Sequence, residues 1–363
     1  MTKQTGLGDR FFLDGFNISG DVGAIQSVLM SSEMIDVTGT DKSARERLVG
    51  LGDSEMTFNA WYNTALNASH DQLKTKADNR HAIYMRGSTA GVPVAAMVAS
   101  QANYNVTRGD NGAMAISAQV MNKSGDLLDW GQALTDGPET STAPEELAVV
   151  HDDQFAAGSS GQLIAYLQVL ALTGDDVIFR LRHSDYVTDT LPADDDLLVV
   201  VTNLLTNNVF TLAGQIAGDA RILTVTVVDS TPSITAGTVR ITGTDAYGAA
   251  LIENINIAAG AGAYETTDRF KTVTEVRTLN DVVTLGGGGN ETIKVGVKAV
   301  SGAFGDITGG QFTTVTAAPA KERIEIDGPI KPYVWVEVDD DMGFSTVTYV
   351  IAIKRFGPRV AGQ

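Results

Sequence analysis

The chain has 363 residues and no cysteine, and 26 lysines and arginines against 44 aspartates and glutamates give it a formal net charge of −18 at pH 7. The lack of cysteine excludes disulfides, thiolate zinc ligands and thiol nucleophiles, and an acidic chain with no basic run longer than two residues is unsuited to tight binding of nucleic acid. The length predicts about two domains, or one large β domain, and the abundance of Thr, Val and Gly predicts a mainly β fold.

The first third of the chain predicts strands with two short helical pieces. In "SEMTFNAWYN", Met56, Phe58 and Ala60 alternate with polar residues, which is the period of a strand. The stretch "TDKSARERL" offers Thr40 or Asp41 as a helix cap, and "SHDQLKTKAD" offers Ser69. We therefore expect a short helix after each of these caps.

The next segments predict further antiparallel strands. The stretch from Tyr84 to Asn122 contains two or three apolar segments and the turn "RGDNG". Two strong strand segments, "GQLIAYLQVLAL" and "DVIFRLRHS", are separated by Thr173–Asp176, which is a hairpin signal. We therefore expect one growing antiparallel sheet as far as Ser184.

The composition changes after Asp185. Between about Val187 and Ala303 there is no tryptophan, and short segments such as "ILTVTVVD" and "GTVRITGTD" recur between turns that contain Gly or Asp. This pattern is typical of a small β-sandwich. Beyond this region, "YVWVEV" and "STVTYVIAIK" predict two further strong strands.

No arrangement of residues predicts catalysis, a cofactor or a bound metal. The runs Asp194–Asp196 and Asp339–Asp341 lack the spaced pattern of a calcium loop, so we expect solvated turns there rather than calcium sites. Neither "GSSG" at Gly158–Gly161 nor "GGGG" at Gly286–Gly289 fits a nucleophile elbow or a phosphate loop. The histidines are scattered without metal-ligand spacing, at His70, His81, His151 and His183. We expect that the chain is not an enzyme.

Five stretches, in the same order, resemble the major tail tube proteins of long-tailed, non-contractile (siphovirus-type) bacteriophages. They are "DRFFLDGFNISGDVGAI", "YMRGSTAGVPVAAMVASQANYNVTRGDNGAMAISAQ", "DWGQALTDG", "LIAYLQVLALTGDDVIFRLRHSD" and "GDITGGQFTTVTAAPAKERIEID". In such proteins "HSD" and "DITGG" usually lie a few residues apart. The resemblance therefore implies a discontinuous tail tube domain, a β-sandwich or barrel with one or two short helices at 1–186 and 304–363. Residues 187–303 would form an inserted domain, which resembles immunoglobulin-like β-sandwich modules.

The resemblance implies a structural virion protein that polymerises as stacked hexameric rings, with the insert projecting outward. Its implied partners are other copies, the tape measure, terminator and distal tail proteins, and double-stranded DNA that passes through the lumen without tight binding. Because DNA is a dense polyanion, we expect most luminal charge to be acidic. The sequence has no secretory signal and no apolar segment long enough for a bilayer, so we expect assembly in the host cytoplasm and no membrane contact.

Two alternatives remain open. The chain could be another virion component, such as a tail terminator or a head decoration protein. The insert could also bind glycans of the host surface weakly, because many copies would multiply a weak contact.

Two sets of residues are expected to serve assembly. A hinge would flank the insert on its near and far sides, at His183, Ser184 and Asp185 and at Phe304, Gly305 and Asp306. Loops that become ordered on contact would delay polymerisation. The candidate loops are marked by Met1, Gly8, Asn103, Arg108, Asp110, Asp126, Arg355 and Pro358.

Overall fold

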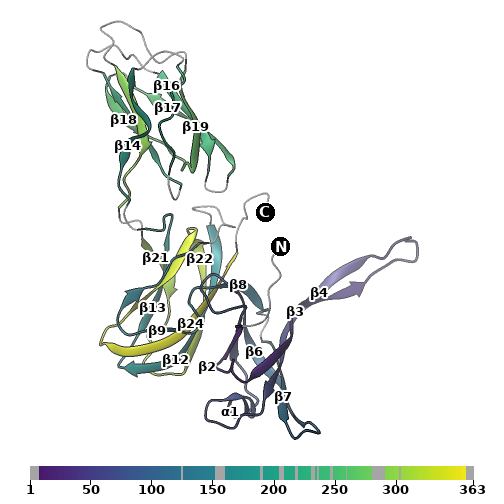
Figure 1. Ribbon diagram of the computed structural model, residues 1–363. Helices are drawn as coiled ribbons and strands as arrows, with labels where there is room; N and C mark the ends of the chain where they lie inside the picture. Colours follow the sequence, from purple (N-terminus) through teal and green to yellow (C-terminus); the bar gives the residue numbers. More distant parts are fainter. Residues whose placement is uncertain are drawn as a thin grey trace. The chain divides into compact units, whose positions relative to one another are not determined.

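The chain forms two compact β units (Figure 1). The computed structural model describes residues 8–123, 126–151, 160–188, 191–203, 208–216, 220–229, 234, 237–245, 248–258, 260–279, 291–301 and 304–356. Among these residues, unit 1 comprises those up to His183 and those from Asp306 to Phe356, and unit 2 comprises those from Ser184 to Gly305. The predicted mainly β class is confirmed, because the described residues contain one short helix, α1 (Ser69–Leu73), among many strands. No helix in the described part is long and apolar enough to cross a membrane.

The largest sheet of unit 1 has twelve strands. It contains β1 (Arg10–Leu13), β2 (Phe16–Asn17), β3 (Val22–Asp36), β4 (Arg47–Trp61), β5 (Arg80–Met85), β6 (Pro93–Arg108), β7 (Met114–Asn122), β8 (Asp129–Ala133), β9 (Glu139–Ser141), β12 (Ser160–Gly174), β22 (Ala320–Pro329) and β24 (Phe344–Phe356). Every pairing within it for which a register is resolved is antiparallel. The described strands therefore form one long, curved surface.

A five-stranded sheet covers the part of the large sheet formed by β12 and β24. It contains β10 (Glu145–Glu146), β11 (Val150–His151), β13 (Ile178–Ser184), β21 (Gly305–Gln311) and β23 (Tyr333–Asp339). Leu167 of β12 and Ile351 of β24 meet Phe179 of β13 and Val336 of β23 in one buried core. These two sheets are therefore the layers of a sandwich.

A second core of unit 1 lies inside a curl of six strands that pair in the order β1, β5, β6, β7, β4, β3. Alternate side chains of these strands point inward, among them Phe11, Phe58, Met97 and Val120, each 2% exposed or less. The strands at the two ends of the curl, β1 and β3, do not pair with each other. The curl therefore stays open and does not close into a barrel.

Unit 2 is a two-layer sandwich. One sheet contains β14 (Asp194–Asn203), β15 (Leu223–Val228), β18 (Gly262–Glu265) and β20 (Thr292–Val297), and the other contains β16 (Gly237–Thr244), β17 (Ala250–Ile257) and β19 (Thr272–Thr278). Val225 and Val295 of the first sheet and Ile241 and Val276 of the second are fully buried in a shared core. Alternation of buried and half-buried residues in β16 matches the sandwich pattern expected from the sequence.

Three predictions are wrong. The segment Thr173–Asp176 does not close a hairpin, because β12 pairs with β22 and β24 whereas β13 pairs with β21 and β23. The turn carries the chain from one sheet to the other, so the expectation of a single sheet as far as Ser184 is also wrong. No helix follows Thr40, since residues 37–46 form the turn between β3 and β4. A short polar helix without a packed face is unstable. Here β3 and β4 instead stay paired as far as this turn.

The helix predicted after Ser69 is present, but its N-terminus is capped differently. Ala68 occupies the cap position and makes no side-chain cap. The Ser69 hydroxyl instead donates to the Trp61 carbonyl at 2.6 Å, and the Ser69 amide donates to Asp21 Oδ2 at 2.9 Å. A carboxylate from a distant turn thus satisfies a free amide of the helix.

Candidate functional site

One face of the strands β3, β4, β7 and β6 carries mainly small, uncharged polar side chains, beside the exposed apolar side chains of Leu29 and Trp61. The register places Asn59 opposite Ser117, which is in turn opposite Asn105. In the neighbouring row, Thr57 lies opposite Gln119, and Gln119 lies opposite Asn103. Because side chains alternate along a strand, these residues point away from the core residues between them. We call this surface, made of Ser27, Glu55, Thr57, Asn59, Asn103, Asn105, Thr107, Ser117 and Gln119, the polar face.

The polar face carries one carboxylate and no cation. In the paired segments, residues 24–29, 55–61, 103–107 and 115–121, there is no lysine or arginine, and Glu55 is the sole acidic residue. The Glu55 carboxylate accepts hydrogen bonds from Ser27 Oγ at 3.2 Å, Thr57 Oγ1 at 3.5 Å and Gln119 Nε2. The surface is therefore neutral to weakly negative. Such a surface offers phosphate groups no charged partner.

Two of the edge strands of the large sheet, β3 and β22, differ in how they are protected. Within the described residues β3 pairs only with β4, and β22 pairs only with β12. The edge strand β22 carries charges at Lys321, Arg323, Glu325 and Asp327, which hinder pairing with another strand. By contrast, residues 22–32 of β3 contain no charged residue. Of these two strands, β3 has the edge that is better suited to pairing with another chain.

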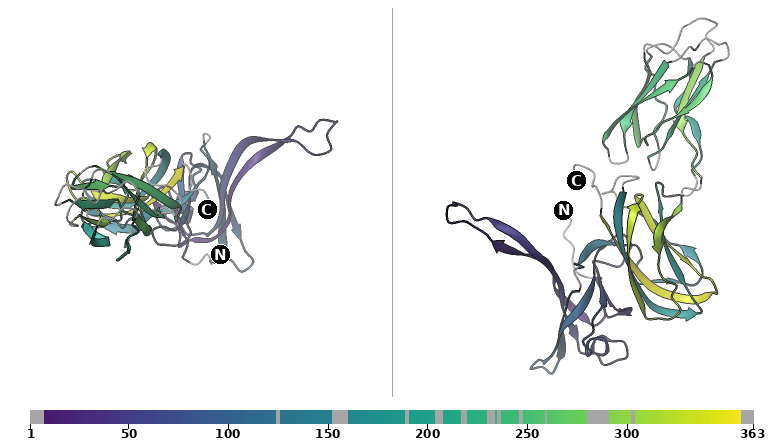
Figure 2. Two further views of the ribbon diagram at one scale, coloured as in Figure 1. Left: turned by 90° about the horizontal axis from the view of Figure 1, so that it is seen from above. Right: turned by 180° about the vertical axis from the view of Figure 1, so that it is seen from behind.

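A long two-stranded arm, residues 30–53, extends from the body of unit 1 (Figures 1 and 2). It is formed by the ends of β3 and β4, which pair only with each other there, because the pairing of β4 with β7 stops at Glu55. Large apolar side chains are exposed on it, with Val49 at 70% and Leu51 at 84%. A two-stranded ribbon is marginally stable alone, and exposed apolar surface of this kind marks an interaction site.

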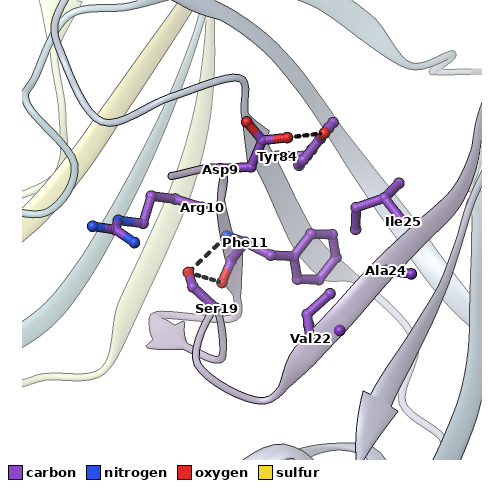
Figure 3. A pocket seen from close by; sticks show the side chains of 9 residues that line it. Asp9, Arg10, Phe11, Ser19, Val22, Ala24, Ile25 and Tyr84 are labelled. Carbon is purple, nitrogen blue, oxygen red and sulfur yellow. Dashed lines mark hydrogen bonds between the residues drawn. The ribbon is translucent and has the colours of Figure 1, made fainter. Parts of the chain in front are cut away.

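A slot of about 260 Å³ lies between β1 and β3, at the opening of the curl (Figure 3). Phe11, Val22 and Ile25 give it an apolar lining. At its rim, Tyr84 donates to Asp9 Oδ2 at 2.5 Å. Burial and this hydrogen bond to Asp9 raise the pKa of Tyr84 to about 12, so its hydroxyl stays protonated. The polar side chains of Asp9, Arg10, Ser19 and Tyr84 also line the slot, so its lining is mixed and more polar than apolar.

Tyr166 is the centre of a buried polar cluster in the large sheet. Its hydroxyl donates to Asp129 Oδ2 at 2.5 Å, and Lys354 Nζ donates to Asp129 Oδ1 at 2.8 Å. Burial and the charge of Asp129 raise the pKa of Tyr166 above its usual range. The hollow beside the cluster has no space for a water-sized molecule. The cluster therefore joins β8, β12 and β24 and offers no room for a substrate.

The described residues contain no group of three or more acidic or histidine side chains placed to hold a metal ion. In the run Asp339–Asp341, Asp339 pairs with Arg180, which lowers the pKa of the Asp339 carboxyl. Asp194 begins β14. The glycines 286–289 and residues 158–159 of "GSSG" lie outside the described residues, whereas Ser160 begins β12.

The near side of the expected hinge is held to unit 2. Asp185 Oδ2 accepts from Arg269 Nη2 at 2.9 Å, and the Arg269 guanidinium lies over the Tyr186 ring, 4.5 Å from its centroid. Ser184 is buried at the end of β13, and its Oγ accepts from the Tyr186 amide at 2.9 Å. Arg269 lies 84 residues away from Asp185, and no signal in the sequence connects the two.

The far side of the expected hinge belongs to a strand. Gly305 and Asp306 open β21, which Phe304 directly precedes, and β21 is the hydrogen-bonded neighbour of β13. Asp306 Oδ1 lies 3.2 Å from Arg182 Nε. His183 Nδ1 accepts from the Lys331 amide at 3.4 Å. The strands on either side of Ser184–Gly305 thus lie next to each other.

The residues expected to mark assembly loops lie in different kinds of structure. Gly8 is exposed, and Asp110 is in the turn between β6 and β7. Asn103 and Arg108 lie within β6, where Asn103 belongs to the polar face. Asp126 Oδ1 lies 3.7 Å from Arg323, and Arg355 is a β24 residue that donates to the Ile330 carbonyl at 2.8 Å. Met1 and Pro358 lie outside the described residues.

Comparison with known proteins identifies no family for this chain. No family model matches it, and no curated protein matches it. Among solved structures, it is similar to the SPP1 Dit (gp 19.1) protein, described as a paradigm of the hub adsorption apparatus in phages that infect Gram-positive bacteria. The identity is 7%, and the match covers 96% of this chain and 99% of that chain with a TM-score of 0.22. At this TM-score the similarity supports no conclusion about fold or function.

Proposed function

We propose that the protein is a structural subunit of a bacteriophage tail, that copies of it polymerise into a hollow tube, and that the polar face lines the channel. The observation that carries this proposal is the composition of the polar face. A wide, solvent-facing surface of four strands has no cation and a single carboxylate, Glu55. The resemblance of the five sequence stretches to tail tube proteins supports the same function.

The polar face suits the passage of DNA. Double-stranded DNA carries one negative charge per about 1.7 Å of axis, and each phosphate that a cation neutralises adds to its retention. A wall of hydroxyl and amide groups lets hydrated DNA slide past. The sequence predicts a lumen whose charge is mostly acidic. The polar face is close to neutral, so it is less acidic than that prediction. A nearly uncharged wall would also let DNA pass, because it has no cations to attract the phosphates.

Polymerisation is supported by two features of unit 1. The uncharged edge of β3 offers backbone groups to a further strand, and the arm exposes Leu51 and other apolar side chains. The net charge of −18 keeps separate subunits soluble before they assemble. Following the resemblance, the subunits would form stacked hexameric rings in a virion tail, with unit 2 projecting outward and no catalytic role.

Negative-stain microscopy of the purified protein tests this proposal. We expect hollow tubes of uniform diameter that lengthen with protein concentration. Closed single rings that never stack would instead favour a tail terminator or a similar virion component. A protein that stays monomeric at high concentration, with and without salt that screens its charge, would contradict the proposal.

A further inference from the structure

The four strands that carry the polar face form a sheet with two free edges. They are hydrogen bonded in the order β3, β4, β7, β6. At one edge, β3 pairs only with β4 in the described part of the chain. At the other edge, Ala99 of β6 still pairs with β5 on one side and β7 on the other, whereas the described strand that pairs with residues 103–108 is β7 alone. The sheet can therefore accept a further strand at either edge.

Neither edge carries the charges that usually prevent strands of different molecules from pairing. Residues 26–32 of β3 and residues 100–107 of β6 contain no lysine, arginine, aspartate or glutamate. Both edges also leave a valine half-buried on the side of the core, Val28 on β3 and Val106 on β6. A further strand at these edges would remove more of this apolar surface from water.

The two edge strands run in opposite directions, because each of the three pairings that connect them is antiparallel. A copy placed beside the first by rotation about the axis of a tube keeps the same strand directions. Its β3 therefore runs antiparallel to β6 of the first copy. In that arrangement the polar faces of both copies lie on the same side of one continuous sheet.

We propose that residues 103–107 of β6 in one copy pair antiparallel with residues 27–31 of β3 in the next copy. Neither segment contains a bulge. In this register Asn105 lies opposite Leu29, and both point to the side of the polar face. On the other side of the sheet, the two half-buried valines lie opposite each other. This proposal deepens the proposed function and rests on it.

The register suits a closed tube. Across the sheet of one copy, Asn105 lies level with Ala24 of β3, whereas in the next copy it pairs with Leu29. The strands are therefore shifted by about five residues, roughly 16 Å, over four strand spacings of about 4.8 Å each. This shift corresponds to a strand tilt of roughly 40° from the tube axis, within the range of about 35–45° that closed barrels need.

The partner strand has to come from another molecule. Within one chain, β4 and β7 lie between β3 and β6, so the two free edges face away from each other. The contact is also of the head-to-tail type, since the edges of β3 and β6 are different surfaces. Contacts of this type generate rings or open filaments rather than closed two-fold dimers. The pairing therefore fits a subunit that polymerises.

Disulfide formation between single-cysteine variants tests this register. The chain contains no cysteine, so each variant has a sole thiol. Residues directly opposite each other in antiparallel strands have Cα atoms about 4.5 to 5.5 Å apart, which a disulfide can bridge. The register places Ser31 opposite Asn103, so mixing Ser31→Cys with Asn103→Cys under oxidising conditions should give a linked dimer. It also places Ser27 opposite Thr107, and Ser27→Cys with Thr107→Cys should do the same.

The crossed mixtures are the matched controls. They are Ser31→Cys with Thr107→Cys and Ser27→Cys with Asn103→Cys, in which the thiols lie four residues out of register, about 13 Å apart. All four residues are exposed or half-buried, so the changes leave the core intact. We expect the linked dimer mainly in the matched mixtures. Crossed mixtures that yield as much of it overturn the proposal.

The contact and the tube fail separately in this experiment. Tubes that form without the matched disulfides would remove the pairing of β3 with β6 and leave the proposed tube. Matched disulfides in a protein that never forms tubes would support the pairing and remove the proposed tube.

Discussion

Lys321 Nζ lies 2.5 Å from Asp14 Oδ1, so β22, a strand from the part of the chain after unit 2, is tied to the first hairpin of the chain. Asp14 also accepts from Arg80 Nη1 at 2.9 Å and from the His81 amide at 2.8 Å. Arg80, which is 3% exposed, donates further to the Gln72 carbonyl at 2.7 Å. One carboxylate thus connects the β1–β2 turn, β5, β22 and, through Arg80, α1.

Replacing Asp14 should destabilise unit 1. Asp14→Asn leaves the buried Arg80 without a counter-charge, and breaking such a pair costs about 3 kcal/mol. Urea unfolding followed by tryptophan fluorescence measures this cost in unit 1 alone, because Trp61, Trp130 and Trp335 all belong to it. The control Asp110→Asn changes an exposed turn and should stay within about 0.5 kcal/mol of the parent. Equal effects of the two changes would show that Asp14 has no such role.

His81 should make unit 1 less stable as the pH falls. Burial, with a smaller contribution from Lys321, lowers the pKa of His81 to about 4, whereas an unfolded histidine titrates near about 6.5. Between these values the unfolded chain binds more protons, so stability falls by up to about 1.4 kcal/mol per pH unit from this residue. His81→Gln should flatten the curve between about pH 6.5 and 5, before most carboxylates titrate. An unchanged slope in this window would contradict the assignment.

Gly15 should tolerate no side chain. It has φ +82°, and an added Cβ would lie 2.8 Å from Pro319 Cβ and 2.9 Å from the Val169 carbonyl oxygen. Gly15→Ala therefore combines backbone strain with a clash, and we expect a loss of about 3 kcal/mol or more. Gly91, with φ +84° and open space around it, is the matched control, and Gly91→Ala should cost only about 1 to 2 kcal/mol. Similar losses at both glycines would argue against the clash.

Arg269 should hold the segment that leads into unit 2. Arg269→Gln removes the ion pair with Asp185 and the stacking on Tyr186, so local opening should become easier. Hydrogen exchange of the Tyr186 amide, which donates to Ser184 Oγ, should speed up several-fold. Lys298→Gln breaks an exposed pair with Glu265 and should leave this exchange unchanged. Exchange at the parent rate in Arg269→Gln would mean that the pair does not restrain the segment.

Strands with one buried face could be predicted well from the sequence. Met56, Phe58 and Ala60 are buried in β4 as their alternation indicates, because one side of the strand faces the core and the other faces water. In β12, residues 163–169 are all buried, so the segment shows no alternation. Its partner strands begin at Ala320 and Phe344, far along the chain. The turn at Gly174 predicts that the chain changes direction, but it does not indicate which sheet the next strand joins.

The polar face has a signal in the sequence. Small polar residues alternate with apolar ones in residues 55–61 and 115–121, and no cation interrupts them. The arm was harder to predict, because its charged tip around Arg45 resembles the start of a helix. Long-range pairs such as Asp185 with Arg269 depend on the folded arrangement of unit 2, and local patterns in the sequence contain no information about them.

Image reconstruction of assembled tubes at a resolution that traces strands tests the central proposal most directly. We predict a hollow tube whose inner wall is formed by β3, β4, β6 and β7, with Asn59, Ser117 and Gln119 pointing into the lumen. A tube in which these three residues lie on the outer surface, or are buried between subunits, would contradict the proposed role of the polar face.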